Sequence, residues 1–273
     1  MEIALERIRN YDGEELDLSS LGLTELPPLP EGLVHLDCGF NRLTSLPALP
    51  ASLRSFYCQY NQLTSLPELP SLDYLHCQRN LLTSLPELPP SLSTLICYNN
   101  QLITLPELPS TLEIIRCNDN RLTSLPTLPV SMIIINCSNN PLETLPTLPL
   151  ELEQLICTNC SLTSLPSLPS TLLRLNCPGN ALETLPELPS TLMGLHCQLP
   201  MYDEPIELVG LEPDLVEHTN HMIRSATLVW EGLSKDRCVG RCKVYKEEIM
   251  MTVWHPKRVA ILIEMGIDLE SVM

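Results

Sequence analysis

The sequence predicts an α/β repeat solenoid, in which short parallel strands stack one above another along the molecule. Three periodic features support this prediction. A Leu-Pro-x-Leu-Pro segment occurs nine times between Leu26 and Pro189, at a spacing of 20 residues that shortens once to 19. A cysteine keeps the same spacing from Cys38 to Cys197, and an asparagine follows most of these cysteines by three residues. Such a period corresponds to one supersecondary unit, which buries its apolar face only by stacking on its neighbours.

Each repeat is predicted to contain one short strand and one extended segment. In the repeat that begins at Leu72, alternation along the strand turns Leu75 and Cys77 inward and Tyr74 and His76 outward. The strands are expected to form a parallel sheet on the concave side of the solenoid. The Leu-Pro-x-Leu-Pro segment is expected to form an extended convex side, because proline fixes its own φ and restricts the residue before it.

The twelve cysteines favour unpaired thiols over disulfides. Nine of them recur with the repeat, so their side chains should all point into the interior in the same direction, which does not suit pairing. We expect small apolar core residues in a reducing compartment, with a metal-binding ladder of thiolates as the alternative. The asparagines are expected to hydrogen-bond backbone groups left unpaired at a tight bend, with Cys160 as a weaker substitute in one repeat.

The pattern Leu-x-x-Leu-x-Cys-x-x-Asn-x-Leu-Thr-Ser-Leu-Pro-x-Leu-Pro resembles the leucine-rich repeat, and over residues 14–200 it is similar to the short bacterial type. That type occurs in effectors injected into host cells, such as the Yersinia outer protein M and invasion-plasmid-antigen-H families, and similar arrays occur in large DNA viruses. The resemblance implies a leucine-rich-repeat horseshoe. The second of these families also has a ubiquitin-ligase cysteine beside an aspartate, a context that neither Cys238 nor Cys242 has. The closer analogy is therefore the first family, a scaffold without a catalytic domain.

Three regions are predicted along the chain. Residues 1–13 form a helical N-terminal cap whose apolar face contains Ile3, Leu5 and Ile8. Residues 14–200 form the repeat array, and residues 201–273 form a small helical C-terminal cap. Within that cap we expect helices over 214–235 and 243–253 and a last helix that begins at Pro256.

The C-terminal region contains the candidates for chemistry other than protein binding. His218, His221, Cys238 and Cys242 are residue types that hold tetrahedral zinc, although the cysteine spacing is atypical for such a site. Residues 235–246 form a basic run that suits a phosphate or an acidic partner. Ordinary cap residues and a solvated turn are the alternatives. No Gly-rich phosphate loop and no hydrolase signature occurs in the sequence.

Outward strand positions vary from repeat to repeat, and in the middle of the array they are apolar or aromatic. Because no helix is expected to cover the concave face, such a stripe predicts a protein-binding surface. The alternative is that isoleucine only satisfies strand propensity. The predicted partner-binding residues are Tyr57, Tyr74, His76, Ile96, Tyr98, Ile114, Arg116, Ile134 and Ile156.

The function predicted from the sequence is that of a non-enzymatic, protein-binding scaffold without a cofactor or a resident metal. A net charge of −17 disfavours binding to nucleic acid or an anionic membrane, no apolar run is long enough to span a bilayer, and no small-molecule site is indicated. We expect a cytoplasmic location, in a host cell if the effector resemblance holds. An enzyme or zinc-dependent module in the C-terminal region and an adhesive surface protein are the alternatives.

Overall fold

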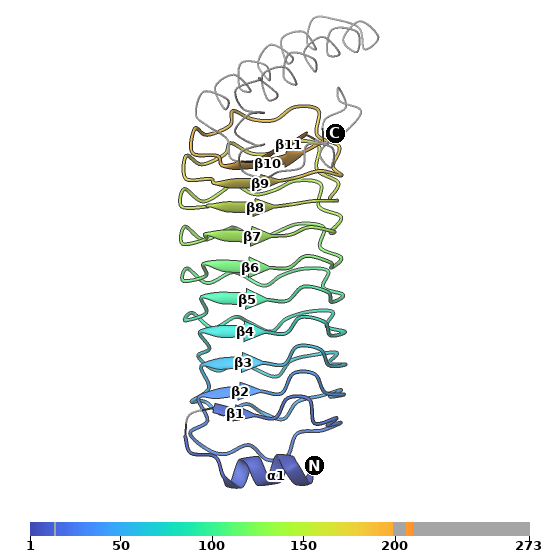
Figure 1. Cartoon of the computed structure of the whole chain (residues 1–273), viewed down its shortest axis with the longest axis vertical. Helices are drawn as coiled ribbons and strands as arrows, with labels where there is room; N and C mark the ends of the chain where they lie inside the picture. The colour runs from blue at the N-terminus through green and yellow to red at the C-terminus, as the bar shows by residue number, and fades with distance from the viewer. Residues whose placement is uncertain (14, 199–205, 210–273) are drawn as a thin grey trace, which may run out of the picture.

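The computed structural model describes residues 1–13, 15–198 and 206–209, which form a column of stacked turns (Figure 1). One helix lies at the N-terminal end, and the strands form a single sheet whose order is the order of the chain. This confirms the predicted parallel solenoid. The elements are α1 (Glu2–Arg9), β1 (Glu15–Asp17), β2 (His35–Asp37), β3 (Ser55–Tyr57), β4 (Tyr74–His76), β5 (Thr94–Ile96), β6 (Ile114–Arg116), β7 (Ile134–Asn136), β8 (Gln154–Ile156), β9 (Arg174–Asn176), β10 (Gly194–Cys197) and β11 (Ile206–Val209).

Each of the strands β1 to β9 is three residues long, and its middle residue is buried. The parallel register places equivalent residues side by side, so that Leu75 adjoins Leu95 and Ile115 adjoins Ile135. The leucines of the rest of the repeat fill the interior behind the sheet. The short period leaves no room for a convex helix, and the proline-rich segment returns the chain in an extended form.

The cysteines of the described residues are all unpaired and buried. Nine of them form the predicted column, in which eight directly follow a strand and Cys197 is the last residue of β10. Cys77, Cys97 and Cys117 of this column are 0% exposed. The interpretation of this column as small apolar core residues is therefore confirmed. Burial raises the pKa of the Cys77 and Cys117 thiols to about 12, which keeps these sulfurs protonated and unreactive at neutral pH.

The asparagine column links each turn of the solenoid to the turn before it. Asn120 Nδ2 donates to the carbonyl of Cys117 in its own turn at 3.0 Å and to the carbonyl of Cys97 in the preceding turn at 3.1 Å. Its Oδ1 accepts from Leu102 N at 3.0 Å. The same pattern recurs at Asn61, Asn80, Asn140 and other members of the column. The predicted role of these amides is therefore present.

Cys160 stands in the asparagine column and fills it incompletely. Its thiol is oriented to donate weakly to the Cys137 carbonyl at 3.5 Å, and it offers no amide oxygen in return. An asparagine at position 160 would accept a hydrogen bond from Leu142 N. In this chain Leu142 N instead donates to the carbonyl of Asn140 at 2.8 Å. The backbone thus compensates locally for the missing acceptor.

Helix α1 closes the N-terminal end of the column, as predicted, but with a different face. Ala4 is fully buried and Ile8 packs against the core, whereas Ile3 and Leu5 are exposed. The small side chain of Ala4 lets the helix lie close to β1. Arg7 anchors the helix by donating to the Asp17 carbonyl and by an ion pair of 3.0 Å with the Asp17 carboxylate.

The C-terminal end of the sheet differs from the prediction at one place. Ile206–Val209 forms β11, which pairs antiparallel with β10, so a strand lies within the region predicted to be helical. An antiparallel strand covers the hydrogen-bonding edge that a parallel stack leaves open. The helices predicted over 214–235, over 243–253 and from Pro256 onward lie outside the described residues.

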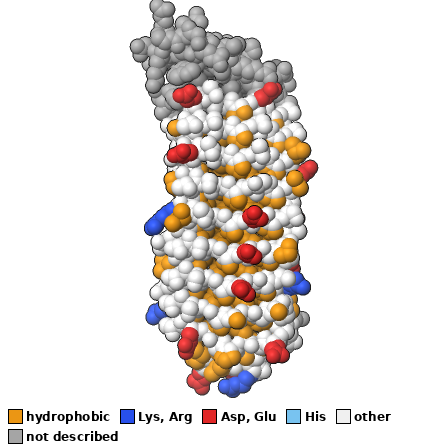
Figure 2. Space-filling model, turned by 180° about the vertical axis from the view of Figure 1, so that it is seen from behind, with side chains coloured by type: hydrophobic (Ala, Val, Ile, Leu, Met, Phe, Trp, Pro, Cys, Tyr) orange, Lys and Arg blue, Asp and Glu red, His pale blue; other side chains and the backbone are white. Residues whose placement is uncertain are grey.

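The face opposite the sheet shows apolar side chains along its whole described length, with scattered charges (Figure 2). The extended segments lie behind the sheet, and many of their leucines pack against the core. Val130 and Leu150, at the tips of neighbouring turns, are each more than three-quarters exposed. Among the described residues, no helix is long and apolar enough to cross a membrane.

The asparagine column is expected to dominate the stability of the array. Replacing Asn120 by alanine leaves the Leu102 amide and two carbonyls without their partner in the interior. We expect the free energy of unfolding to fall by about 2–4 kcal/mol. Urea denaturation followed by circular dichroism measures this loss. Gln154→Ala removes a partly exposed amide that makes none of these hydrogen bonds, and it should change the free energy by less than about 0.5 kcal/mol.

Restoring asparagine at position 160 is expected to stabilise the chain. Cys160→Asn supplies an acceptor for Leu142 N and a stronger donor to the Cys137 carbonyl, so the free energy of unfolding should rise by about 1 kcal/mol. Cys157→Asn is the matched control, because it places the same amide in the apolar column and should destabilise the chain. Equal urea midpoints for the two variants would contradict this account.

Candidate protein-interaction face

The candidate site is the face of the sheet that points away from the core, which corresponds to the concave face of the sequence prediction and is called the outer face below. The first and third residues of each strand line it. The parallel register stacks these residues in two columns, so that Ile114 adjoins Ile134 and Tyr57 adjoins His76. Among the described residues, no helix covers the strands on this side (Figure 1). The sheet therefore presents a continuous surface to solvent.

The structure brings the predicted binding residues onto this one face, but with different degrees of exposure. Tyr74 is 44% exposed, and Arg116 also extends into solvent. Tyr98 lies just beyond β5 rather than within a strand. The half-buried members of the predicted set are Tyr57, His76, Tyr98, Ile114, Ile134 and Ile156.

The expectation that Ile96 is exposed on this face is wrong. Ile96 points outward from β5, yet only 8% of its surface is exposed. In register it lies between His76 and Arg116, two longer side chains. Burial lowers the pKa of His76, and the charge of Arg116 lowers it further. Ile96 therefore supports its neighbours and contributes little contact surface.

Tyr57 and His76 form an edge-to-face pair, with ring centroids 4.8 Å apart and planes at 84°. A lowered pKa leaves the imidazole mostly neutral at pH 7. The pair consequently offers a polar aromatic surface, which suits protein contacts.

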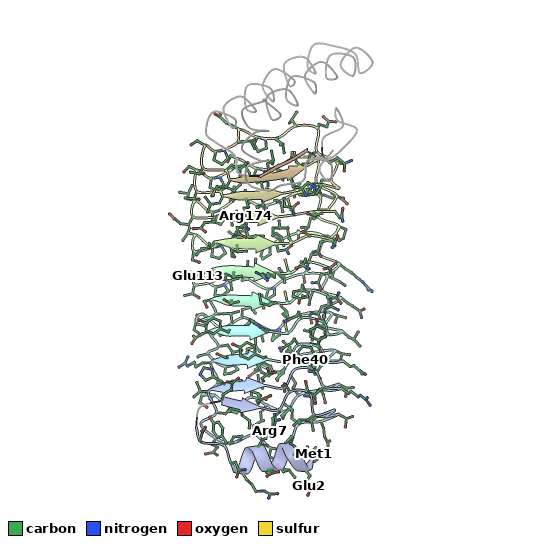
Figure 3. The ribbon with its side chains drawn as sticks, viewed as in Figure 1. Met1, Glu2, Arg7, Phe40, Glu113 and Arg174 are labelled. Carbon is green, nitrogen blue, oxygen red and sulfur yellow. The ribbon has the colours of Figure 1, made fainter. Side chains whose placement is uncertain are left out.

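Sequence reasoning missed an aromatic ladder at the carboxyl end of the strands. This ladder consists of Phe40, Tyr60 and Arg79, which occupy equivalent positions in consecutive turns. Phe40 and Tyr60 stack with centroids 4.4 Å apart and an angle of 15°, and the Arg79 guanidinium lies 5.0 Å from the Tyr60 centroid. Figure 3 shows Phe40 beyond the ends of the strand arrows. The signal in the sequence is the residue before each column asparagine, which is aromatic in two successive repeats.

The ladder residues occupy a backbone conformation that disfavours them. Phe40, Tyr60 and Arg79 all have φ of 55°, in the left-handed region, where a side chain costs about 1–2 kcal/mol. Most other turns have a small residue, an asparagine or an aspartate at this position. Asparagine and aspartate suit the left-handed conformation, and a small residue avoids most of its steric crowding. These equivalents are Ser20, Asn99, Asp119, Asn139, Asn159 and Gly179.

Carboxylates gather at the N-terminal end of the outer face. Asp17 and Asp37 are register neighbours, and each accepts a hydrogen bond from the backbone amide two residues ahead, that of Ser19 at 2.8 Å and that of Gly39 at 2.7 Å. Burial raises the pKa of Asp37, and the charges of Asp17 and Glu15 raise it further. This end of the face is therefore electronegative and suits a cationic group.

Two glutamine side chains lie between the strands and the aromatic ladder. Gln59 Oε1 and Gln78 Oε1 are buried and have no hydrogen-bond partner among the described residues. A Cβ on Gly39 would lie 2.6 Å from Gln59 Nε2 and 3.1 Å from Asp37 Oδ1. The Gln59 amide and the Asp37 carboxylate thus lie close to the position that a Cβ on Gly39 would take, and a larger residue at position 39 would displace them.

The described residues contain no group of three or more side chains that could hold a metal ion. The zinc hypothesis concerns His218, His221, Cys238 and Cys242, and these residues, like the basic run 235–246, lie outside the described part of the chain. The arrangement on the outer face consists of aromatic, aliphatic and charged contact groups.

Comparison with known proteins identifies the family. Residues 51–90 match a family model described as two copies of leucine-rich repeats. YopM from Yersinia enterocolitica WA-314 has 36% sequence identity and a TM-score of 0.62, over 72% of this chain and 50% of that one. The chain is a leucine-rich-repeat protein. It spans about half the length of that YopM chain. The predicted resemblance to the short repeats of bacterial effectors is confirmed.

A Shigella effector leucine-rich-repeat domain is also similar, with 28% identity and a TM-score of 0.47 over 66% of this chain and 77% of that domain. YopM from Yersinia pestis has 27% identity and a TM-score of 0.37 over 77% and 92% of the two chains. No curated protein sequence matches the chain.

Removing the Asp37 charge is expected to stabilise the leucine-rich-repeat array at neutral pH. Because the folded-state pKa of this acid is raised, its charged form opposes folding above that pKa. The penalty disappears as pH falls below the unfolded value near 3.8. Asp37→Asn keeps an acceptor for the Gly39 amide, so it should raise the urea midpoint at pH 7 and lose this advantage near pH 3.5. A stabilisation that is equal at both pH values would contradict the electrostatic explanation.

Proposed function

We propose that this leucine-rich-repeat protein is a non-enzymatic scaffold that binds a protein partner through its outer face. The observation that supports this most is the outward position of aromatic and aliphatic side chains, exposed at Tyr74 and half-buried at the isoleucines, on a sheet that no described helix covers. Tyr74, Ile114 and Ile134 lie on consecutive or nearby strands, with the two isoleucines in register. Apolar and aromatic groups on a rigid repeat framework form the centre of many protein interfaces.

The partner-binding set extends along the face from β3 to β8. Tyr57, Tyr74, His76 and Tyr98 supply aromatic contacts at one end, and the isoleucines and Arg116 supply the middle. Ile96 is buried between His76 and Arg116 and supports the set without offering much contact surface. The strands hold these side chains at fixed spacings, so little conformational entropy is lost when a partner binds.

We further propose that the protein acts in a reducing cytoplasm, and that this is the cytoplasm of a host cell. The unpaired, buried cysteines of the described array support a reducing compartment. The similarity of the repeats to those of YopM supports the host cell. The net charge of −17 supports a protein partner over nucleic acid or an anionic membrane.

Charge introduced at the centre of the outer face should abolish partner binding. A partner is first captured by a photoreactive phenylalanine analogue placed at position 74 and is then purified. The double variant Ile114→Asp, Ile134→Asp should weaken its affinity at least about thirtyfold, because it buries two unpaired carboxylates in the interface. Titration by surface plasmon resonance measures the change.

Val130→Asp is the matched control, because Val130 is 79% exposed but lies at a turn tip rather than on the outer face. It should leave affinity within about twofold. If Val130→Asp loses binding while the double variant keeps it, the interface lies at the edge of the solenoid and the proposal is refuted.

A further inference from the structure

We propose that the N-terminal end of the outer face binds an arginine side chain of the partner protein, seated on the open face of Phe40 beside the carboxylates of Asp17 and Asp37. This inference rests on the proposed function, because it requires a protein partner. It adds the chemistry that the partner presents and the place where that chemistry is recognised.

The aromatic ladder has one covered end and one open end. In column order Tyr60 lies between Phe40 and Arg79, so its ring is stacked on one side and capped by a guanidinium on the other. The neighbour of Phe40 on its other side is Ser20, which has no ring. Phe40 is 51% exposed. A second guanidinium on this face would repeat the arrangement that Arg79 already makes within the chain.

Charge at the open end favours a cation. Asp17 and Asp37 adjoin in register, and Glu15 lies on the same strand as Asp17. Arg7 pairs with Asp17, whereas the described residues place no ion pair on Asp37. A cation placed between Phe40 and these carboxylates gains both cation–π and Coulombic stabilisation. The raised pKa of Asp37 is consistent with negative charge that lacks a compensating cation.

Two glutamine amides lie beside the same region. The Gln59 amide and the Asp37 carboxylate meet above Gly39. Gln59 Oε1 is buried without a partner, and Gln78, which is 9% exposed, has an equally unpartnered Oε1 in the next turn. Both oxygens are buried, so they add a local free-energy cost to the folded chain and are not themselves contacts for the arginine.

Arginine fits these demands better than lysine or a neutral side chain. Its guanidinium is planar, so it stacks on an aromatic ring, and it presents five N–H donors toward the carboxylate oxygens. Lysine provides the charge without the planar stack. A partner segment with an arginine flanked by apolar residues would also continue onto Tyr57 and Tyr74.

The test uses two fluorescent nonapeptide pools and the full chain. One pool has arginine at the central position, and the other has citrulline, which has nearly the same shape without the charge. The remaining positions are randomised among uncharged residues other than cysteine. Fluorescence anisotropy should show at least tenfold tighter binding of the arginine pool. Phe40→Asn should reduce that binding to the citrulline level, and Asp37→Asn should weaken it severalfold.

The substitutions are chosen so that the variants keep the fold. Asparagine occupies the position of Phe40 in three other turns, at Asn99, Asn139 and Asn159, so Phe40→Asn is compatible with the backbone. Circular dichroism and the urea midpoint confirm that it folds. Val130→Asn removes an even more exposed apolar side chain at a turn tip and should leave arginine-pool binding unchanged.

Three results of the peptide and sedimentation experiments would overturn the arginine site. The first is equal binding of the two pools, and the second is arginine-pool binding that Phe40→Asn does not reduce. The third is a dimer in sedimentation velocity that Phe40→Asn dissociates, because a second copy of the chain would then be the occupant. The proposed function is tested separately with the captured partner, and unchanged affinity of the Ile114→Asp, Ile134→Asp variant would refute it whatever the peptide pools show. If the captured partner is lost in the Ile114, Ile134 variant but binds Phe40→Asn normally, the scaffold proposal stands and the arginine site falls.

Discussion

The hydrogen bonds of the column asparagines are the constraint on which the rest of the molecule depends. A turn of 20 residues cannot satisfy its backbone alone, because it contains only three strand residues and an extended return segment. The amide of Asn120 joins carbonyls of two successive turns and accepts an amide hydrogen from the earlier one. Since every turn needs its neighbour in this way, stability comes from stacking, and the strand spacing is constant along the array. That constancy allows the outer face to be a rigid surface.

The division between framework and free positions explains how much could be predicted from the sequence. Leucine, cysteine and asparagine repeat because their surroundings repeat, so their periodicity indicates strand, core column and turn directly. The outward positions follow from alternation along each strand, which predicted that Tyr57 and His76, or Ile114 and Ile134, lie side by side. The register follows from the same pattern, because a slip of one residue would turn the buried middle residue of a strand to the solvent side.

The errors arise where a side chain's surroundings depend on neighbours rather than on the repeat. Ile96 has the same outward position as Ile156, but longer side chains on both sides cover it. In α1 the helical period was correct, whereas close packing on β1 selected the small Ala4 for burial instead of Ile3 or Leu5. β11 lies in a stretch without the repeat pattern, and its pairing follows from the open edge of β10 rather than from its own sequence.

The aromatic ladder shows why sequence periodicity alone also missed part of the candidate site. Nothing in the letters shows that the residue before each column asparagine has a positive φ, and only the structure shows that Phe40 and Tyr60 hold an unfavourable backbone conformation. The same region contains the destabilising charge of Asp37 and the unpartnered oxygens of Gln59 and Gln78.

Asparagine at the ladder position would serve the fold at lower cost, as it does in later turns. The isolated chain therefore bears several local free-energy costs within consecutive turns that its architecture does not require. The cost at Asp37 is offset when a ligand supplies the missing cation, which is why this end of the face is where contact with a partner has most to gain.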